Sequence, residues 1–461
     1  MDTPIIDFVK KYNEAKTTRF HMPGHKGVSF LGFEKLDITE IGGADDLSCP
    51  EGIIKKSEEN ASALFNTKCT AFSTGGSTQS INAMLYIAFL NRAENTAPFV
   101  IAGRNAHKAF MFAAAKIGFD VEWLYPEKTN SLCSAVITAT DLENKLESLN
   151  EKPFAVYITS PDYLGNITDI KSLSAVCKKY NVPLLVDNAH GAYSAFLKEA
   201  FHPILTGADM CCDSAHKTLP ALTGCGYLHI KKDDCFNFGR DVHNAMTVFG
   251  TSSPSYLLLQ SLDFCNKYIS ENIKSDLDQC AKKVDEVNTL LAGTAIKNIS
   301  KEPIKITLDF SEFKKSDFNV AEHFRKHNIE FEYCDEDYVV FMVTAQNSDE
   351  DFERLKRAII NLPELIKNEN CNEFKFVNGN QKMSIRDAIF SKSQEIPVED
   401  AIGKICATPT VSCPPAIPIV VSGEEITKEH VELLKRYGKE SIKVVSSQSV
   451  SKSVVIFYTN H

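Results

Sequence analysis

Short apolar runs of strand-like composition alternate with helix-like segments from about residue 58 onward, and this alternation constrains the fold more than any other feature of the chain. The runs FVIAG at 99–103 and PLLVD at 183–187 are typical of buried strands, because they are short, continuous and flanked by turn residues. Strands that alternate with helices of moderate length indicate βαβ units around a mostly parallel sheet. We therefore predict an α/β protein.

The same pattern predicts the other elements of this sheet. Further strands are expected at 121–125, 154–160, 208–214 and 225–230. Helices are expected at 57–72, 77–92, 105–119 and 138–150, and near 170–180.

The pattern restarts after a long helical stretch at 255–292, which predicts a second, smaller α+β unit. This unit holds strand-like runs at 305–310, 330–334 and 338–345 and helices near 318–327 and 350–361. The tail from residue 371 differs, because its prolines limit regular structure. We expect the 461 residues to form an N-terminal arm at 1–45, a major domain at 46–290, a small α+β domain at 291–370 and a C-terminal domain at 371–461.

The composition excludes several classes of protein. Hydrophobic residues make up 43% of the chain and charged residues 24%, which is typical of folded proteins and far from the signature of disorder. The formal net charge of -10 argues against a nucleic-acid partner and is compatible with a cationic ligand. The 14 cysteines include no CxxC pair and no Cys/His cluster at zinc spacing, so we expect no metal site and a reducing compartment. We find no signal peptide and no membrane span, which makes the cytoplasm the expected location.

Polar residues that directly follow strands are the first candidates for a binding site, because ligands of open α/β sheets bind at the carboxyl ends of the strands. In FSTGGSTQS at 72–80 a pair of glycines leads into a helix, whose N–H groups and dipole suit a phosphate. An ordinary glycine turn with a Ser or Thr N-cap explains the same residues. The segment is not a P-loop, because the GK[ST] ending is missing.

Three single residues follow other strands. Asp187, at the end of LLVD, suits a protonated ring nitrogen or a metal, although a lone Asp there more often caps a turn. Lys217 follows the strand at 208–214; a partly desolvated lysine becomes nucleophilic and can form a Schiff base, although a lone lysine is more often solvated. His107 can stack on an aromatic cofactor or belong to a surface turn. The order of phosphate-type turn, Asp and Lys is that of the fold-type I pyridoxal phosphate (PLP) enzymes, and it is far more specific than any one member.

Longer segments resemble the Orn/Lys/Arg decarboxylase family in its short bacterial form, which lacks the N-terminal wing domain of the long members. The segments follow the order of the family from residue 20 to residue 424, and SAHK and PGHK are the most distinctive of their motifs. They are FHMPGHKG, DITEIGGADDLSCPEGIIKKSE, STGGSTQSINAML, RNAHKAF, ITSPDYLGNITDI, LLVDNAHGAY, DSAHKTLPALTG, GTSSPSYLLLQSLD and EDAIGKICATPTVSCPPAIPIVVSGE.

The resemblance implies a PLP-binding major domain of fold type I at 46–290 and assigns roles around the cofactor ring. Lys217 would be the Schiff-base lysine, and Asp187 would pair with the pyridinium nitrogen. His107 would stack on the ring, while His190 and His216 would flank it, with His216 as a candidate proton donor. The reaction implied is decarboxylation of a basic amino acid to an amine and CO2, in which the cofactor acts as the electron sink.

The resemblance also assigns the groups that hold the cofactor phosphate. Gly76, Ser77 and Ser214 would bind it from the same chain. Thr251 and Ser252 resemble the segment that reaches a phosphate across a dimer interface, so a homodimer is implied.

Several positions depart from the family pattern. Val28 replaces the second glycine of PGHKGG, and Cys413 and Ala416 stand at the tyrosine and glycine of the late YPPG motif. Lys404 and Cys406 replace the arginine and serine of GRISA. Cys211 and Cys212 lie on the strand that leads to Lys217, and Cys406 and Cys413 stand at altered positions on the expected substrate side. Inactivation of the protein by thiol reagents is therefore a hypothesis.

The distal cation of a basic substrate requires an acidic partner, and a desolvated carboxylate would discriminate strongly against neutral side chains. The candidates, each of which taken singly is more often a solvated surface charge, are Glu40, Asp45, Asp46, Glu399 and Asp400.

Three functions remain open from the sequence. The first is a decarboxylase that makes a polyamine precursor, with arginine or lysine favoured over ornithine. The second is another fold-type I reaction, by an aminotransferase or a lyase, although no C-terminal arginine motif typical of aminotransferases is evident. The third is an inactive PLP-binding paralogue, against which Lys217, Asp187 and His107 are all intact.

Overall fold

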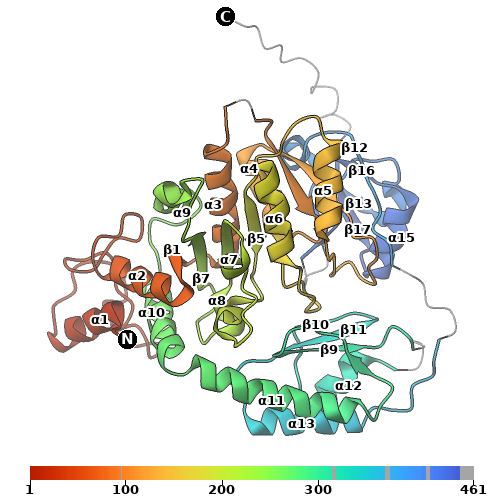
Figure 1. The fold of residues 1–461 in the computed structure, drawn as a ribbon. Helices are drawn as coiled ribbons and strands as arrows, with labels where there is room; N and C mark the ends of the chain where they lie inside the picture. The colour runs from red at the N-terminus through yellow and green to blue at the C-terminus, as the bar shows by residue number, and fades with distance from the viewer. Residues whose placement is uncertain (95, 314–317, 369–373, 412–415, 447–461) are drawn as a thin grey trace, which may run out of the picture.

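A seven-stranded sheet lies at the centre of the computed structural model, with the strand order β1-β7-β6-β5-β4-β2-β3 (Figure 1). The structure describes residues 1–446 except 95, 314–317, 369–373 and 412–415. The strands of the sheet are β1 (Thr67–Ser73), β2 (Phe99–Gly103), β3 (Asp120–Leu124), β4 (Ala155–Thr159), β5 (Leu184–Asp187), β6 (Met210–Asp213) and β7 (Gly226–Lys231).

Most of this sheet is parallel, as the sequence predicts. The pairs β2–β3, β2–β4, β4–β5 and β5–β6 run parallel, whereas β7 runs antiparallel to both β6 and β1. The prediction of a single helix at 57–72 is wrong, because α2 (Ile53–Phe65) ends early and β1 follows it. Asn66 between them adopts a left-handed conformation with φ of 54°, which stops the helix and which Asn tolerates.

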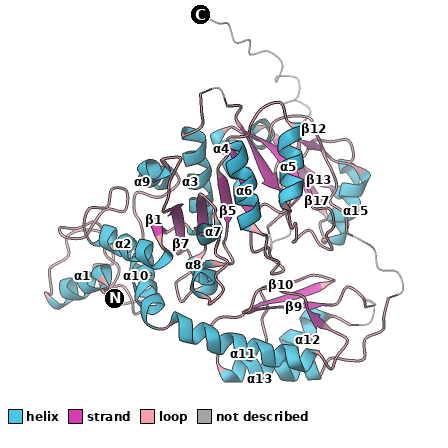
Figure 2. Cartoon of the chain, in the orientation of Figure 1, coloured by secondary structure: helices cyan, strands magenta, loops and turns pink. Residues whose placement is uncertain are grey.

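Helices cover both faces of the sheet (Figure 2). One face packs against α3 (Gly76–Leu90), α4 (Lys108–Ile117) and α9 (Val242–Val248), and the other against α5 (Ala139–Ser148), α6 (Ile170–Tyr180) and α7 (Pro203–Thr206). Neighbouring side chains of β4 therefore enter different cores, with Tyr157 in the first and Ile158 in the second. Both faces are buried, which explains why the strands read as continuous apolar runs.

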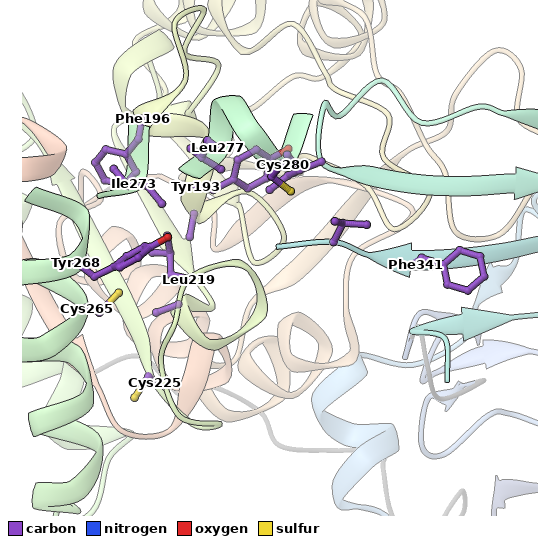
Figure 3. Close-up of a cluster of buried hydrophobic side chains, with 14 of the residues drawn as sticks. Tyr193, Phe196, Leu219, Cys225, Cys265, Tyr268, Ile273, Leu277, Cys280 and Phe341 are labelled. Atoms are coloured by element: carbon purple, nitrogen blue, oxygen red, sulfur yellow. The ribbon is translucent and has the colours of Figure 1, made fainter. Parts of the chain in front are cut away.

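The small α+β domain follows two consecutive helices, α10 (Tyr256–Glu271) and α11 (Ile273–Leu291). A four-stranded sheet with the order β10-β11-β9-β8 packs with α12 and α13. Figure 3 shows how its core continues into the major domain, since Phe341 of β11 lies in one cluster with Leu277 of α11 and with Tyr193 and Phe196 of η1 (Ala192–Phe196). The remaining elements of the small domain are β8 (Lys297–Asn298), β9 (Lys305–Asp309), α12 (Val320–Lys326), β10 (Tyr333–Cys334), β11 (Tyr338–Met342) and α13 (Asp349–Ile360).

The C-terminal region consists of short two-stranded antiparallel sheets and two helices, of which α14 packs against α4 of the major domain. Arg104, which is fully buried, donates hydrogen bonds to the carbonyls of Pro418 (2.8 Å) and Ile419 (3.1 Å) and so joins the region to the main sheet. The elements are β12 (Asn380–Gln381), α14 (Ile385–Phe390), β13 (Ser393–Pro397), η3 (Val398–Ala401), β14 (Thr410–Val411), β15 (Pro418–Val420), β16 (Glu424–Glu425), α15 (Lys428–Arg436) and β17 (Ser441–Val445).

The N-terminal arm is anchored by its first helix, α1 (Pro4–Glu14). Backbone N–H groups of Ile5 and Ile6 donate to the Asp263 carboxylate of α10 at 3.0 and 3.1 Å, so that side chain occupies the free N–H groups of the first turn. Within the described ranges, no helix combines the length and the apolar composition that a membrane span requires.

Candidate active site

A cavity of about 390 Å³ opens where β4, β5 and β6 end, at the carboxyl edge of the sheet. It brings together all the residues that the sequence predicts around the cofactor except Thr251 and Ser252, which are exposed and do not line it. The lining residues are Gly75, Gly76, Ser77, Thr78, Asn105, His107, Cys133, Thr159, Pro161, Tyr163, Asp187, Ala189, His190, Ser214, His216, Lys217, Thr223, Gly224, Ala416 and Ile417.

The glycine turn between β1 and α3 forms one wall of the cavity. Gly76 has φ of +64°, a conformation that glycine adopts without strain, and its N–H donates to the Gly224 carbonyl at 2.7 Å. The hydroxyl of Ser214, from the loop after β6, donates to that of Ser77 at 2.9 Å. The first turn of a 15-residue helix and two hydroxyls therefore meet at one point, which is an arrangement that suits a phosphate.

Asp187 ends β5 in the floor of the cavity and is only 2% exposed. Its carboxylate accepts hydrogen bonds from the Tyr157 hydroxyl at 3.0 Å and from the Ala189 N–H at 3.2 Å. Burial raises the pKa of Asp187, while these donors and the Lys217 amine oppose that rise. A carboxylate buried this deeply favours a ligand that brings a positive charge or a proton to it.

Lys217 lies in the short helix α8 (Ala215–Thr218), directly after β6. Its Nζ atom is 2.8 Å from His190 Nε2 and 5.8 Å from the centre of the Tyr163 ring. Burial lowers the pKa of Lys217, although the carboxylates of Glu332 and Asp187 act in the opposite direction. A lysine in this setting carries an uncharged amine more readily than a surface lysine and is the strongest nucleophile candidate of the cavity.

Three histidines surround Lys217. His107 caps α4, since its Nδ1 accepts from the Ala109 N–H at 3.1 Å, and burial with the nearby cations lowers its pKa to about 4. His216 Nδ1 lies 2.7 Å from the Cys225 carbonyl, so the ring donates there and leaves Nε2 as an acceptor. Burial also lowers the pKa of His216 and of His190, so all three rings are predominantly neutral at neutral pH.

Sequence reasoning did not predict several other residues that contact the site. The Tyr163 hydroxyl donates to Glu332 of the small domain at 2.6 Å, and Lys305 of the same domain reaches His190. These contacts join residues more than 100 positions apart, and no local motif marks Glu332 or Lys305. Tyr157 had a weak signal, because it lies on the predicted strand at 154–160, next to the strand that ends at Asp187.

The cavity fits a polar cofactor with a phosphate and a ring nitrogen. Two buried groups that line it, Asn105 Nδ2 and Thr159 Oγ1, have no hydrogen-bond partner within the described part of the chain. Buried polar atoms of this kind are costly unless something pairs with them, so they favour a polar ligand here. The phosphate-type turn, Asp187 and Lys217 all line the same cavity.

The residues at the altered family positions lie in different surroundings in the structure. Ala416 lines the cavity and has φ of 59°, a conformation that suits the glycine of the family pattern, and its carbonyl accepts from the Lys108 N–H at 2.9 Å. Cys406 is buried in the C-terminal core, and Lys404 is exposed. Cys413 lies outside the described residues.

The hypothesis of thiol-directed inactivation finds no support at Cys211 and Cys212. Both side chains are fully buried, and burial raises the pKa of each thiol well above its usual value. Reactive cysteines need access and thiolate character, and these two have neither.

The acidic candidates for the distal cation do not line the cavity of a single chain. Asp45 instead accepts hydrogen bonds from the backbone at the start of α2, including Gly52 N–H at 2.7 Å. Glu399 pairs with Lys435 at 2.9 Å. Besides Asp187, the carboxylate of Glu332 acts on the site, because it accepts from the cavity-lining Tyr163 hydroxyl and favours the ammonium form of Lys217; sequence reasoning did not single it out.

The fold and the site together define an α/β enzyme of fold type I, with a mostly parallel sheet and a buried lysine at its carboxyl edge. Two family models match the chain, the Orn/Lys/Arg decarboxylase major domain at residues 3–299 and the Orn/Lys/Arg decarboxylase C-terminal domain at residues 366–441. The chain belongs to the Orn/Lys/Arg decarboxylase family.

Relatives in sequence and in structure agree with this assignment. The arginine decarboxylase of Halalkalibacterium halodurans is 28% identical over 96% of this chain and 94% of its own length. The arginine decarboxylase of Bacillus subtilis is 28% identical over 94% of this chain and 93% of its own. Among solved structures, the lysine decarboxylase of Francisella novicida has a TM-score of 0.76 at 18% identity, covering 96% of this chain and 81% of that one. The constitutive lysine decarboxylase of E. coli has a TM-score of 0.75 at 16% identity, covering 96% and 82%. These two structures share the fold.

Proposed function

We propose that this chain is a PLP-dependent decarboxylase that converts arginine or lysine, and less readily ornithine, to the corresponding amine and CO2. The observation that carries the proposal is the position of Lys217, which lines the cavity together with Asp187 and whose amine lies 2.8 Å from a neutral histidine. The relatives named arginine decarboxylase match nearly the full length of the chain and favour arginine among the substrates.

The cavity residues divide the work of holding the cofactor. The N-terminus of α3 with the hydroxyls of Ser77 and Ser214 would bind the phosphate, and Gly76 allows the close approach of the backbone. Asp187 would hold a proton on the ring nitrogen, and the neutral His107 ring would stack on the pyridine face. When bound, PLP supplies an electron sink for the pair of electrons that the departing carboxylate leaves behind.

The same residues also control protons during turnover. Lys217 presents its uncharged amine to a carbonyl carbon and must recover that position at the end of each cycle. His216, whose Nδ1–H is fixed on the Cys225 carbonyl, would deliver a proton to the substrate Cα from Nε2. The lowered pKa of His216 makes its protonated form a stronger acid, which suits this transfer.

We also infer a homodimer. Phe20, Phe30 and Leu31 of the N-terminal arm are 95%, 73% and 77% exposed in the single chain, and apolar side chains exposed to this degree in one segment indicate an interaction surface. Thr251 and Ser252 are exposed as well, which is consistent with a phosphate contact made to a second copy. A cytoplasmic location and a role in making polyamine precursors complete the proposal.

The test is to incubate the purified chain and PLP with arginine, lysine and ornithine separately and to measure CO2 and the amine products. The proposal predicts that arginine gives agmatine or lysine gives cadaverine, with one CO2 released for each molecule of amine. A keto acid or an elimination product in place of the amine would establish another fold-type I reaction. Binding of PLP without any turnover would establish an inactive paralogue.

A further inference from the structure

A buried lysine of the small domain contacts one of the histidines of the site. Lys305, the first residue of β9, is 2% exposed, and its Nζ atom lies 3.4 Å from His190 Nδ1. The other nitrogen of the same ring, Nε2, is the atom that lies 2.8 Å from Lys217 Nζ. One imidazole therefore connects two lysines from different domains.

Lys305 has a fixed counter-charge. It forms an ion pair with the fully buried Glu302, three residues earlier, and the Tyr193 hydroxyl donates to the same carboxylate at 2.9 Å. Burial raises the pKa of Glu302, while the Lys305 amine and the Tyr193 hydroxyl oppose that rise. Because a buried charge without a partner is costly, the direct contact of this carboxyl with the Lys305 amine favours the ion pair, with the proton on Lys305. An ammonium group has three donors and no acceptor.

The ammonium of Lys305 determines which nitrogen of His190 carries the proton. Because Lys305 can only donate, Nδ1 must accept, and the single proton of the neutral ring then resides on Nε2. Nε2–H can only donate to Lys217 Nζ, which accepts only when that amine has a free electron pair. The chain of contacts is consistent with an uncharged Lys217 and disfavours its ammonium form.

We propose that Lys305, held by Glu302, is a positioning residue that fixes the proton of His190 on Nε2 and thereby keeps the Lys217 amine uncharged and nucleophilic. The inference deepens the proposed function, since it rests on Lys217 as the reactive amine, and it extends the site into the small domain. Lys305 acts through His190 and touches no reacting atom.

The charged groups around these residues support this assignment. Lys217 faces the carboxylates of Asp187 and Glu332, which favour its ammonium, and the cation Lys305, which opposes it. The pKa of Lys217 is nevertheless lowered, chiefly by burial. His190 lies among Lys217, Lys305 and two other histidines, His107 and His216, and the pKa of its ring falls well below the usual value because of burial and of these cations.

Competitive labelling measures the charge state of Lys217 without any catalysis. The full-length chain is first dialysed against hydroxylamine to remove any carbonyl compound, and then treated with a limiting amount of acetic anhydride over a series of pH values. Acetylation of Lys217 is quantified by peptide mass spectrometry against Lys198, whose side chain is 84% exposed. The half-point of the labelling curve reports the pKa of the Lys217 amine.

Two variants and one control test the proposal. Lys305→Met removes the cation, and the double variant Glu302→Gln, Lys305→Met removes the whole ion pair, so that no unpaired buried charge threatens folding. Both should raise the half-point by about one unit or more, which is about a tenfold loss of uncharged amine below that pH. Lys301→Met, an exposed lysine of the same loop, should leave the curve unchanged.

The outcomes separate this proposal from the proposed function. An unshifted half-point in the folded double variant overturns the role of Lys305, whether or not the enzyme decarboxylates anything. A shifted half-point supports it even if the substrate assay finds a different reaction, because labelling requires neither cofactor nor substrate.

Discussion

Removal of the Tyr157 hydroxyl should raise the pKa of Asp187 without disturbing the packing around the site. Tyr157 is fully buried, and its hydroxyl donates to Asp187 at 3.0 Å. Tyr157→Phe keeps the ring packed among the residues of the same core and deletes only the donor. Asp187 then retains the Ala189 N–H as its remaining backbone donor.

The size of the effect follows from the kind of hydrogen bond lost. A hydrogen bond to a charged group contributes about 1.5–3 kcal/mol, and one pKa unit corresponds to about 1.4 kcal/mol. The pKa of Asp187 should therefore rise by about one to two units, in the same direction as the rise already caused by burial. Because the ring nitrogen needs an ionised Asp187, the acidic limb of the pH–activity profile should move upward by the same amount.

The assay is the pH dependence of kcat for amine release, compared with that of Tyr180→Phe. Tyr180 donates to Glu147 at 3.1 Å on the surface, so its variant loses the same type of hydrogen bond outside the site. The reasoning is refuted if the acidic limb of Tyr157→Phe coincides with those of the wild type and the control. A shift in both variants would likewise show that the effect does not come from Asp187.

Three further predictions concern stability and reactivity. His202 and His229 hold the pKa of the buried Asp213 well below its usual value, although burial alone would raise that pKa. The contribution of the ionised Asp213 to stability should thus be present above about pH 4 and be lost as the pH falls. Asp213→Asn should lower the free energy of unfolding by about 3–5 kcal/mol at pH 7. An unfolding curve within error of the wild type would contradict this. Ala416→Gly should raise the free energy of unfolding in urea by about 0.5 kcal/mol, since relief of about 1–2 kcal/mol of left-handed strain exceeds the entropic cost of glycine; a decrease would show that Ala416 is not strained. Iodoacetamide should leave the thiols of Cys211 and Cys212 unmodified under native conditions, as judged by peptide mass spectrometry, because both are buried; their alkylation would mean that the strand opens.

The sequence predicted the sheet well because its strands are buried on both faces. The run at 183–187 is apolar up to its last residue, Asp187, which is the polar residue that lines the cavity. The strand β1 was missed because a helical pattern runs directly into it, and only the left-handed Asn66 separates the two. The division into four domains stays a prediction.

The part of the site that escaped prediction comes from long-range packing. Gly76, Asp187 and Lys217 lie in local motifs that follow strands, whereas Glu332 and Lys305 reach the site only because the small domain docks against the major one. Their neighbours in sequence carry no signature of chemistry. The roles assigned to the motif residues remain predictions for the experiments above.

The attachment point of the cofactor is the most direct test of the whole account. Full-length chain incubated with PLP is reduced with borohydride, digested and analysed by peptide mass spectrometry. The account predicts a reduced pyridoxal phosphate adduct on Lys217, with loss of the visible absorbance band in Lys217→Ala. An adduct on another lysine, or none on a folded chain, would contradict it.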